Sequence, residues 1–172
     1  MINSRNEWDT LEAVVVGDAT AANWPMTDPV FREEARTSLW KETPAPSGHV
    51  HQKIVDQANR ELDILSETLS RRGVTVYRPA PMDFPKRNGM YNYCPRDRLL
   101  IAGNVVVDVN MMYPCRNQEI ENYNQILDLA QTVVTMPRDA GMTLDAANIC
   151  RLGDTWLFLE SASGNRAAYE WL

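Results

Sequence analysis

Residues 97–107 read DRLLIAGNVVV, and residues 145–159 read DAANICRLGDTWLFL. In each stretch an aspartate precedes an apolar run, a Gly-Asn or Gly-Asp turn and a second apolar run. Two short strands joined by such a two-residue turn are typical of a β-hairpin. The turn glycines, Gly103 and Gly153, each precede an arginine by the same thirteen residues. This fixed spacing indicates a repeated supersecondary unit.

The repeat places Asp97 and Asp145 each at the start of a hairpin. Two aspartates at the same edge of a repeated unit can converge on one ligand. The pattern also arises if two unrelated hairpins share a turn type, and spacing alone leaves both interpretations open. Locally, Asp97 would be a turn or cap residue after Pro95, and Asp145 would be a helix N-cap.

The composition is that of an ordinary globular protein. The 172 residues suffice for one domain with a real core, and 44% of them are hydrophobic. The net charge of −6 argues against a nucleic-acid partner, since such proteins carry a basic patch. No apolar run approaches the length of a membrane span, and the N-terminus shows no apolar signal region. We therefore expect a cytoplasmic protein.

The remaining pattern predicts an α/β fold. Apolar residues at helical spacing predict a helix over residues 54–72, with Gly73 directly after it. A short buried strand is expected over residues 12–17, and an alternating strand over residues 74–78. Residues 18–50 contain several prolines and are predicted to form one long irregular loop, with a short helix over residues 31–41.

Further elements are expected in the C-terminal part. A helix is predicted over residues 119–131, a strand over residues 132–136, and a second helix from Asn165 onward. The last of these ends on apolar residues up to Leu172. It is either the start of a domain that the chain interrupts or a docked terminal helix.

Several blocks of the sequence resemble the arginine-dependent, glycine amidinotransferase family of the pentein superfamily. The most specific are Cys-Pro-Arg-Asp, which ends at Asp97, and Asp-Ala-Ala, which begins at Asp145. The others are residues 3–4, 6–9, 11–17, 57–62, 103–104, 111, 116–119, 151–153, 163–167 and 170–172. The resemblance implies an incomplete pentein-type α/β propeller of ββαβ modules around a polar channel. It further implies that residues 1–172 are a single domain, the N-terminal portion of such a protein.

This family transfers the amidino group of L-arginine to an acceptor amine such as glycine, through a thiouronium formed on a cysteine. By resemblance, Asp97 and Asp145 are the carboxylates that hold the guanidinium. A planar guanidinium offers a fork of donors that suits carboxylates accepting bidentate hydrogen bonds. Asp145 would also orient the catalytic histidine. Both aspartates are therefore expected to be catalytic and substrate-binding residues.

Arg116 is similar to the arginine of the family's Arg-x-x-Glu block, with Glu119 as its partner. It is a candidate substrate-binding residue, and the alternative is a structural ion pair across the edges of two modules. The chain departs from the family here, since many relatives have an aromatic residue where this chain has Asn117-Gln118. The following insert is also shortened, to roughly residues 122–143. These departures put glycine in doubt as the acceptor.

The family's histidine and nucleophilic cysteine are expected beyond the region that matches Trp171 and Leu172. Cys94, Cys115 and Cys150 do not match the nucleophile's motif and are expected to be buried, inert thiols. The 172-residue chain alone is therefore expected to be inactive. Uncovered strand edges would favour a homodimer.

No metal or cofactor is expected. His49 and His51 alternate, but no nearby cysteine or acidic cluster completes a site. Two other functions stay open: a non-catalytic module that binds guanidino compounds or assembles with another chain, and part of a hydrolytic pentein such as a deiminase. The Asn-Glu-Trp-Asp and Asp-Ala-Ala-Asn blocks look more like amidinotransferases.

Overall fold

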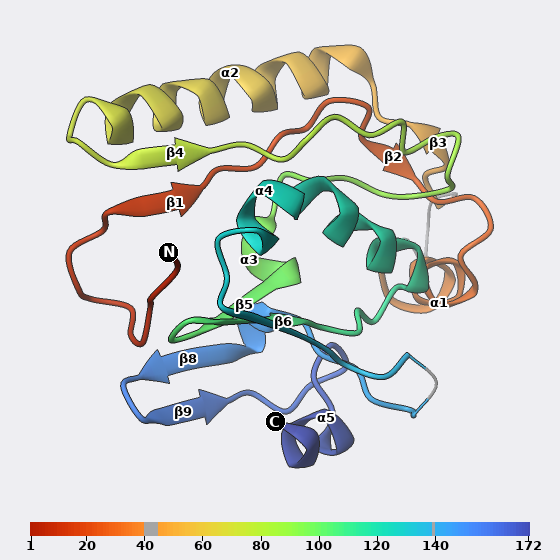
Figure 1. The fold of residues 1–172 in the computed structure, drawn as a ribbon. Coiled ribbons are helices and arrows are strands. Elements are labelled where there is room, and N and C mark those ends of the chain that lie inside the picture. The colour runs from red at the N-terminus through yellow and green to blue at the C-terminus, as the bar shows by residue number, and fades with distance from the viewer. Residues whose placement is uncertain (40–44, 139) are drawn as a thin grey trace. The chain divides into compact units, whose positions relative to one another are not determined.

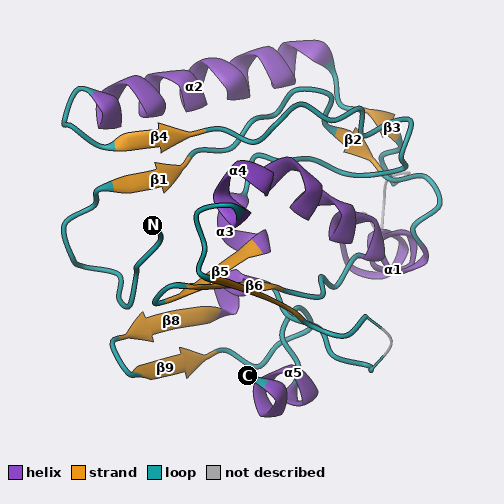
Figure 2. Cartoon of the chain, viewed as in Figure 1, coloured by secondary structure: helices purple, strands orange, loops and turns teal. Residues whose placement is uncertain are grey.

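The structure, a computed structural model, describes residues 1–39, 45–138 and 140–172 (Figures 1 and 2). The chain, expected to form one domain, divides into two compact units, which are described separately. The first unit comprises residues 1–11, 95–112 and 123–172, and the second comprises residues 12–94 and 113–122. Helices and strands alternate in both, so the fold is mixed α/β, as predicted. Among the described helices, none combines the length and the apolar character that crossing a bilayer requires.

A βαβ arrangement organises the second unit. β1 (Ala13–Val15) pairs in parallel with β4 (Thr75–Tyr77), and α2 (Gln52–Ser70) precedes β4 and runs alongside it (Figure 2). Gly73 adopts a φ of +84° just beyond the helix and turns the chain into β4. The predicted helix and both strands are therefore confirmed, with each end of the helix two residues earlier than expected. β1 is only partly buried, although a buried strand was expected.

α2 buries less than its apolar stripe predicts. Val55 is its one buried residue and packs in a small cluster with Ala19 and Ala22. Ile54 and Leu65, both in the predicted stripe, are 60% and 46% exposed. The later turns of the helix are held by contacts with β4 and by Arg78, which donates to Asp63 at 2.8 Å and to Ser66 at 3.2 Å.

Short elements occupy much of the stretch 18–50, which the sequence predicted as an irregular loop with one short helix over residues 31–41. They are β2 (Asn23–Trp24), α1 (Pro29–Glu34), a π-helical segment (Ala35–Leu39) and β3 (Gly48–His49). The carboxylate of Asp28 starts α1 by accepting hydrogen bonds from the amides of Val30 and Phe31 at 3.0 and 2.9 Å. A short helix is therefore present as predicted, and it begins two residues earlier, at Pro29. β2 and β3 were not predicted, because strands of two residues show no periodicity. Residues 40–44 lie outside the described residues.

Two antiparallel hairpins organise the first unit. β5 (Leu99–Ala102) pairs with β6 (Val105–Asp108), and β8 (Ile149–Leu152) pairs with β9 (Thr155–Phe158). The glycine of each turn has a positive φ, as the two-residue turns require. The predicted hairpins are confirmed.

A short helix precedes each hairpin, and this completes the repeat. α3 (Pro95–Arg98) leads into β5, and the 3-10 helix η3 (Ala146–Asn148) leads into β8. β7 (Thr132–Thr135) adds a parallel third strand beside β6. In the described residues the two hairpins belong to separate sheets. Helix, strand, turn and strand thus recur as one unit.

The core of the first unit lies between the hairpins and α5 (Arg166–Trp171). Its fully or nearly buried members are Leu100, Val107, Val109, Met111, Met136, Met142, Leu144, Ala146, Ile149 and Ala168. Asn165 caps α5, since its side-chain oxygen accepts from the amide of Ala168 at 3.0 Å. Trp171 packs against the same core. The last helix is therefore packed against the core of its own unit.

The N-terminal segment pairs with both hairpins. Ser4 and Gly103 exchange two backbone hydrogen bonds of 2.9 Å at the first turn. Asn6 forms a bridge with Leu152, and the amide of Gly153 donates to the carbonyl of Arg5 at 3.0 Å. Residues 4–6 therefore connect two sheets that share no strand ladder in the described chain.

Candidate functional site

Asp97 lies within α3, the single-turn helix before β5, and its side chain is partly buried. α3 packs directly against η3, the element that follows Asp145. The two aspartates predicted to share a guanidinium therefore belong to neighbouring elements of one unit.

Asp145 is the N-cap of η3. One of its carboxylate oxygens accepts from the amide of Ala147 at 2.9 Å, and its own amide donates to the carbonyl of Ser163 at 2.6 Å. The capping role considered for it locally is therefore correct. A carboxylate has two oxygens with about four acceptor positions, so capping and guanidinium binding are compatible.

The two aspartates do not occupy equivalent positions in the repeat. Asp97 is the second residue before β5, whereas Asp145 is the fourth residue before β8. Pro95 is the residue that matches Asp145 in the first hairpin. Both aspartates thus precede a hairpin, but Asp97 lies inside its helix and Asp145 caps the next one.

Arg116 lies in the second unit, in the 3-10 helix η2 (Pro114–Tyr123). Its Nε and Nη2 donate to the two carboxylate oxygens of Glu119 at 2.9 and 3.0 Å, and both side chains are almost fully buried. The guanidinium also lies over the ring of Tyr91, with its carbon 4.7 Å from the centroid. The ion pair is present, but it lies within one helix and not across the edges of two modules. The arrangement supports a structural role for Arg116.

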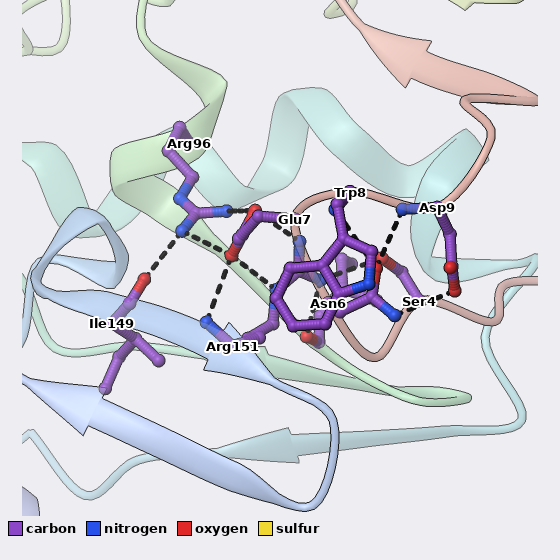
Figure 3. A network of polar contacts seen from close by, with 9 residues as sticks. Ser4, Asn6, Glu7, Trp8, Asp9, Arg96, Ile149 and Arg151 are labelled. Atoms are coloured by element: carbon purple, nitrogen blue, oxygen red, sulfur yellow. Dashed lines mark hydrogen bonds and ion pairs between the residues drawn. The ribbon is translucent and has the colours of Figure 1, made fainter.

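A network of charged residues connects the N-terminal segment to α3 and β8 (Figure 3). The Glu7 carboxylate accepts from Nε and Nη2 of Arg151 at 2.9 and 3.1 Å, and from Nη1 and Nη2 of Arg96 at 3.3 and 3.0 Å. The hydrogen bonds from Arg151, with those from Arg96, lower the pKa of Glu7 to about 2. Glu7 thus carries its charge at neutral pH.

A second network holds the other end of α3. The fully buried Arg98 donates to the carboxylate of Asp108 and to the carbonyl of Val109. Nη2 of Arg138 reaches both oxygens of Asp108 at 2.7 Å. Asp97 therefore lies between two arginines, Arg96 and Arg98, that are each anchored to a neighbouring element.

Neither network was predicted from the sequence. Glu7, Arg96 and Arg151 all fall within blocks that carry the family resemblance, yet they are far apart along the chain. The opposite charges within those blocks were the one sequence feature that could have predicted these ion pairs. Nothing in the spacing showed that they meet.

The three cysteines differ in environment. Cys150 is exposed on β8, although a buried thiol was expected, because its side chain points away from the core face of the hairpin. Cys94 and Cys115 are partly buried. Burial, together with the nearby Asp28 carboxylate, raises the pKa of the Cys115 thiol well above its usual range. Cys115 is therefore not an activated nucleophile.

His49 and His51 have no metal-binding partners in the described part of the chain, where no group of three or more His, Cys, Asp or Glu side chains could hold an ion. His51 caps α2, with its Nδ1 accepting from the amide of Lys53 at 3.2 Å.

Comparison with known proteins shows a consistent set of relatives, although no family model matches the sequence. The whole chain is 32% identical to inosamine-phosphate amidinotransferase 1 of Streptomyces glaucescens and covers 59% of that protein. It is 30% identical to the mitochondrial glycine amidinotransferase of Danio rerio, over 72% of the chain and 32% of the relative. The chain thus spans well under two thirds of the length of these relatives.

Comparison with solved structures also finds amidinotransferases. The inosamine-phosphate amidinotransferase of Streptomyces griseus superposes with a TM-score of 0.85 at 28% identity, over 99% of this chain and 58% of that one. An amidinotransferase of the saxitoxin biosynthetic pathway from Microseira wollei gives a TM-score of 0.79 at 26% identity, over 99% of this chain and 58% of that one. A dimethylarginine dimethylaminohydrolase shares the fold alone, with a TM-score of 0.62 at 14% identity, over 94% of this chain and 54% of that one.

The hairpin repeat and these neighbours define a protein of the pentein superfamily. Within that superfamily, the chain belongs to the amidinotransferase family.

Proposed function

We propose that this protein takes part in amidino transfer from L-arginine, and that Asp97 and Asp145 hold the guanidinium of the donor. The packing of α3 against η3 carries the proposal, because these elements bear the two aspartates. Two carboxylates suit a planar cation that offers five N–H donors. Membership of the amidinotransferase family supports the same assignment.

The proposed reaction has two steps. A cysteine thiolate forms a bond to the guanidinium carbon, and ornithine leaves as its C–N bond breaks and its nitrogen takes a proton. The acceptor amine then attacks the resulting thiouronium, and the C–S bond breaks to restore the thiolate. Asp97 and Asp145 would hold the central carbon still during both attacks. The thiolate and the histidine that moves the proton are assigned to no residue of this chain.

We also propose that the two hairpins are neighbouring ββαβ modules of a pentein propeller, and that the chain forms the N-terminal portion of a single such domain. The repeat of helix, strand, turn and strand supports this. A cytoplasmic location is part of the proposal, on the basis of three cysteines without paired spacing.

For the acceptor amine, the relatives favour inosamine phosphate over glycine. The inosamine-phosphate amidinotransferases match 100% of the chain, whereas the glycine amidinotransferase matches 72%. The departure from the family at Asn117-Gln118 is a second observation against glycine as the acceptor.

Calorimetric titration with L-arginine tests the guanidinium site. Asp97→Ala and Asp145→Ala should each weaken binding by about tenfold or more, because each removes charge-assisted hydrogen bonds worth about 1.5–3 kcal/mol. Asp154→Ala is the matched control, since this aspartate lies in the β8–β9 turn with a side chain 95% exposed. Failure of the wild-type chain to bind arginine, or unchanged affinity in both variants, would refute the proposed site.

A non-catalytic guanidino-binding or assembly module is the second candidate. The raised pKa of Cys115 favours it, because a protonated thiol is a poor nucleophile. On this account the chain binds arginine but releases no ornithine and acquires no mass adduct on any cysteine. Ornithine release that Cys150→Ser abolishes would exclude it. The hydrolytic alternative has less support, since the hydrolase neighbours share only the fold.

A further inference from the structure

Glu7 lies where the N-terminal segment passes between the two hairpins. Two residues before it pair with those hairpins, Ser4 with Gly103 and Asn6 with Leu152. After Glu7, the amides of Trp8 and Asp9 donate to Oδ1 of Asn6 at 3.1 and 2.9 Å. The side chain of Glu7 points toward α3 and β8 (Figure 3).

The two arginines that bind Glu7 come from the elements next to the two aspartates. Arg96 is the residue before Asp97 in α3, and Arg151 lies in β8, which directly follows η3 and its cap Asp145. One carboxylate thus receives a guanidinium from each side of the proposed donor site.

Each arginine also donates a hydrogen bond to the backbone of the other hairpin. Nη2 of Arg96 donates to the carbonyl of Ile149 at 2.6 Å, at the start of β8. Nη1 of Arg151 donates to the carbonyl of Ile101 in β5 and to the hydroxyl of Ser4, both at 3.0 Å. These side chains supply cross-links between hairpins that lie in separate sheets.

We propose that Glu7 is a positioning residue that fixes the spacing of Asp97 and Asp145. The inference rests on the proposed guanidinium site. Glu7 touches neither the donor nor the acceptor; it acts through Arg96 and Arg151.

The charge of Glu7 is the important property. With the carboxylate present, one negative charge lies between two positive ones. Without it, Arg96 and Arg151 face each other as like charges, and Arg151 is 7% exposed, so water screens it poorly. The repulsion would separate α3 from β8, and the two aspartates would move apart.

Glu7→Gln tests the proposal, because glutamine keeps the size of the side chain and removes its charge. Asp154→Asn is the matched control: it removes another link between the N-terminal segment and the second hairpin, the 3.4 Å pair with Arg5, which does not involve α3. Glu7→Asp is the conservative variant, which restores the charge.

Two measurements are needed. The first is amide hydrogen exchange by NMR at Ala147 and Asn148, whose amides donate to Asp145 at 2.9 Å each. The second is the Kd for L-arginine at a temperature where every variant is folded. We expect Glu7→Gln to speed exchange at both amides and to weaken arginine binding by about tenfold. Asp154→Asn should change neither quantity, and Glu7→Asp should recover part of both.

Faster exchange confined to residues 1–11, or a lowered melting temperature with an unchanged Kd, would show that Glu7 only holds the N-terminal segment and would overturn the proposal. If wild type does not bind arginine, the proposed function fails. In that case exchange at Ala147 and Asn148 alone decides whether Glu7 positions η3.

Discussion

At the scale of single residues, the Arg116–Glu119 pair and the network around Glu7 have different roles. Arg116 and Glu119 form a closed pair within one helix, with the side chain of Glu119 1% exposed. Glu7 is 31% exposed at its side chain and connects separate elements. The first pair stabilises its own unit, whereas the second also affects where other side chains lie.

The first prediction concerns the pH dependence that Glu7 causes. Its pKa is lowered from 4.5 to about 2, first by the hydrogen bonds from Arg151 and then by those from Arg96. A lowered pKa in the folded state stabilises the protein fully above the unfolded value near 4.5, and this contribution disappears as the pH falls toward 2. The free energy of unfolding of wild type should therefore exceed that of Glu7→Gln at pH 6, and the difference should shrink between pH 4.5 and 2. Urea titrations at several pH values measure it, and a constant difference would contradict the assignment.

The second prediction concerns Arg116→Met. The substitution leaves the buried carboxylate of Glu119 without the guanidinium, which should cost about 3–5 kcal/mol in the free energy of unfolding. Arg166→Met is the control, because its pair with Glu170 is 65% and 64% exposed and should cost under about 1 kcal/mol. Equal losses in the two variants would show that the buried pair has no special structural role.

At the scale of the elements, glycines set two of the boundaries in the second unit. Gly73 ends the turn after α2 with a φ of +84°, and a Cβ there would meet no atom within 4 Å. Gly17 follows β1, and a Cβ there would lie 2.2 Å from the carbonyl oxygen of Tyr93. Gly73 is needed for its left-handed backbone conformation, and Gly17 is needed because the backbone of Tyr93 passes too close for a Cβ.

The third prediction compares these two glycines. Gly73→Ala should cost about 1–2 kcal/mol, because an alanine must adopt a left-handed conformation there, and Gly73→Asn should cost less. Gly17→Ala should cost more than Gly73→Ala, because the backbone of Tyr93 must move. Thermal or urea unfolding gives the order, and a reversed order would contradict the account.

Elements with a strong local pattern could be predicted from the sequence. α2 shows helical periodicity, and the hairpins show apolar runs around a glycine turn, so both were found. The aspartates of the candidate site were found through a resemblance. The proposed role of Glu7 could not be predicted from the sequence. That role depends on pairing between residues 4–6 and two turns that come much later in the chain. The exposure of Ile54 could not be found either, since periodicity shows which residues share a face but not what covers it.

At the scale of the whole molecule, several apolar side chains of the first unit face solvent at strand edges. Val133 and Val134 in β7 are 42% and 38% exposed, and Leu157 in β9 is 57% exposed. Unpaired edges with apolar side chains favour association with another chain. We therefore propose a homodimer through this unit.

The fourth prediction tests that association. Light scattering at micromolar concentration should show a dimer for wild type, and Leu157→Lys should shift it toward the monomer, because a charged side chain disfavours edge pairing. Ile64→Lys is the control, since this residue is similarly exposed, at 63%, but lies on α2 in the other unit. A monomeric wild type would refute the dimer, and an equal shift in both variants would refute the proposed edge.

The division of the first unit among three separate stretches of chain has a consequence for the order of folding. Residues 4–6 are synthesised long before their pairing partners, Gly103 and Leu152. They can pair only after both hairpins have been made. The hairpins and the βαβ arrangement depend on nearer contacts and form sooner, because chain closure over long separations is slow. Trp8 in this segment stays 64% exposed after docking, so burial of its side chain contributes little to that step. The segment that joins the two hairpins is thus expected to dock last, and its docking marks completion of the unit.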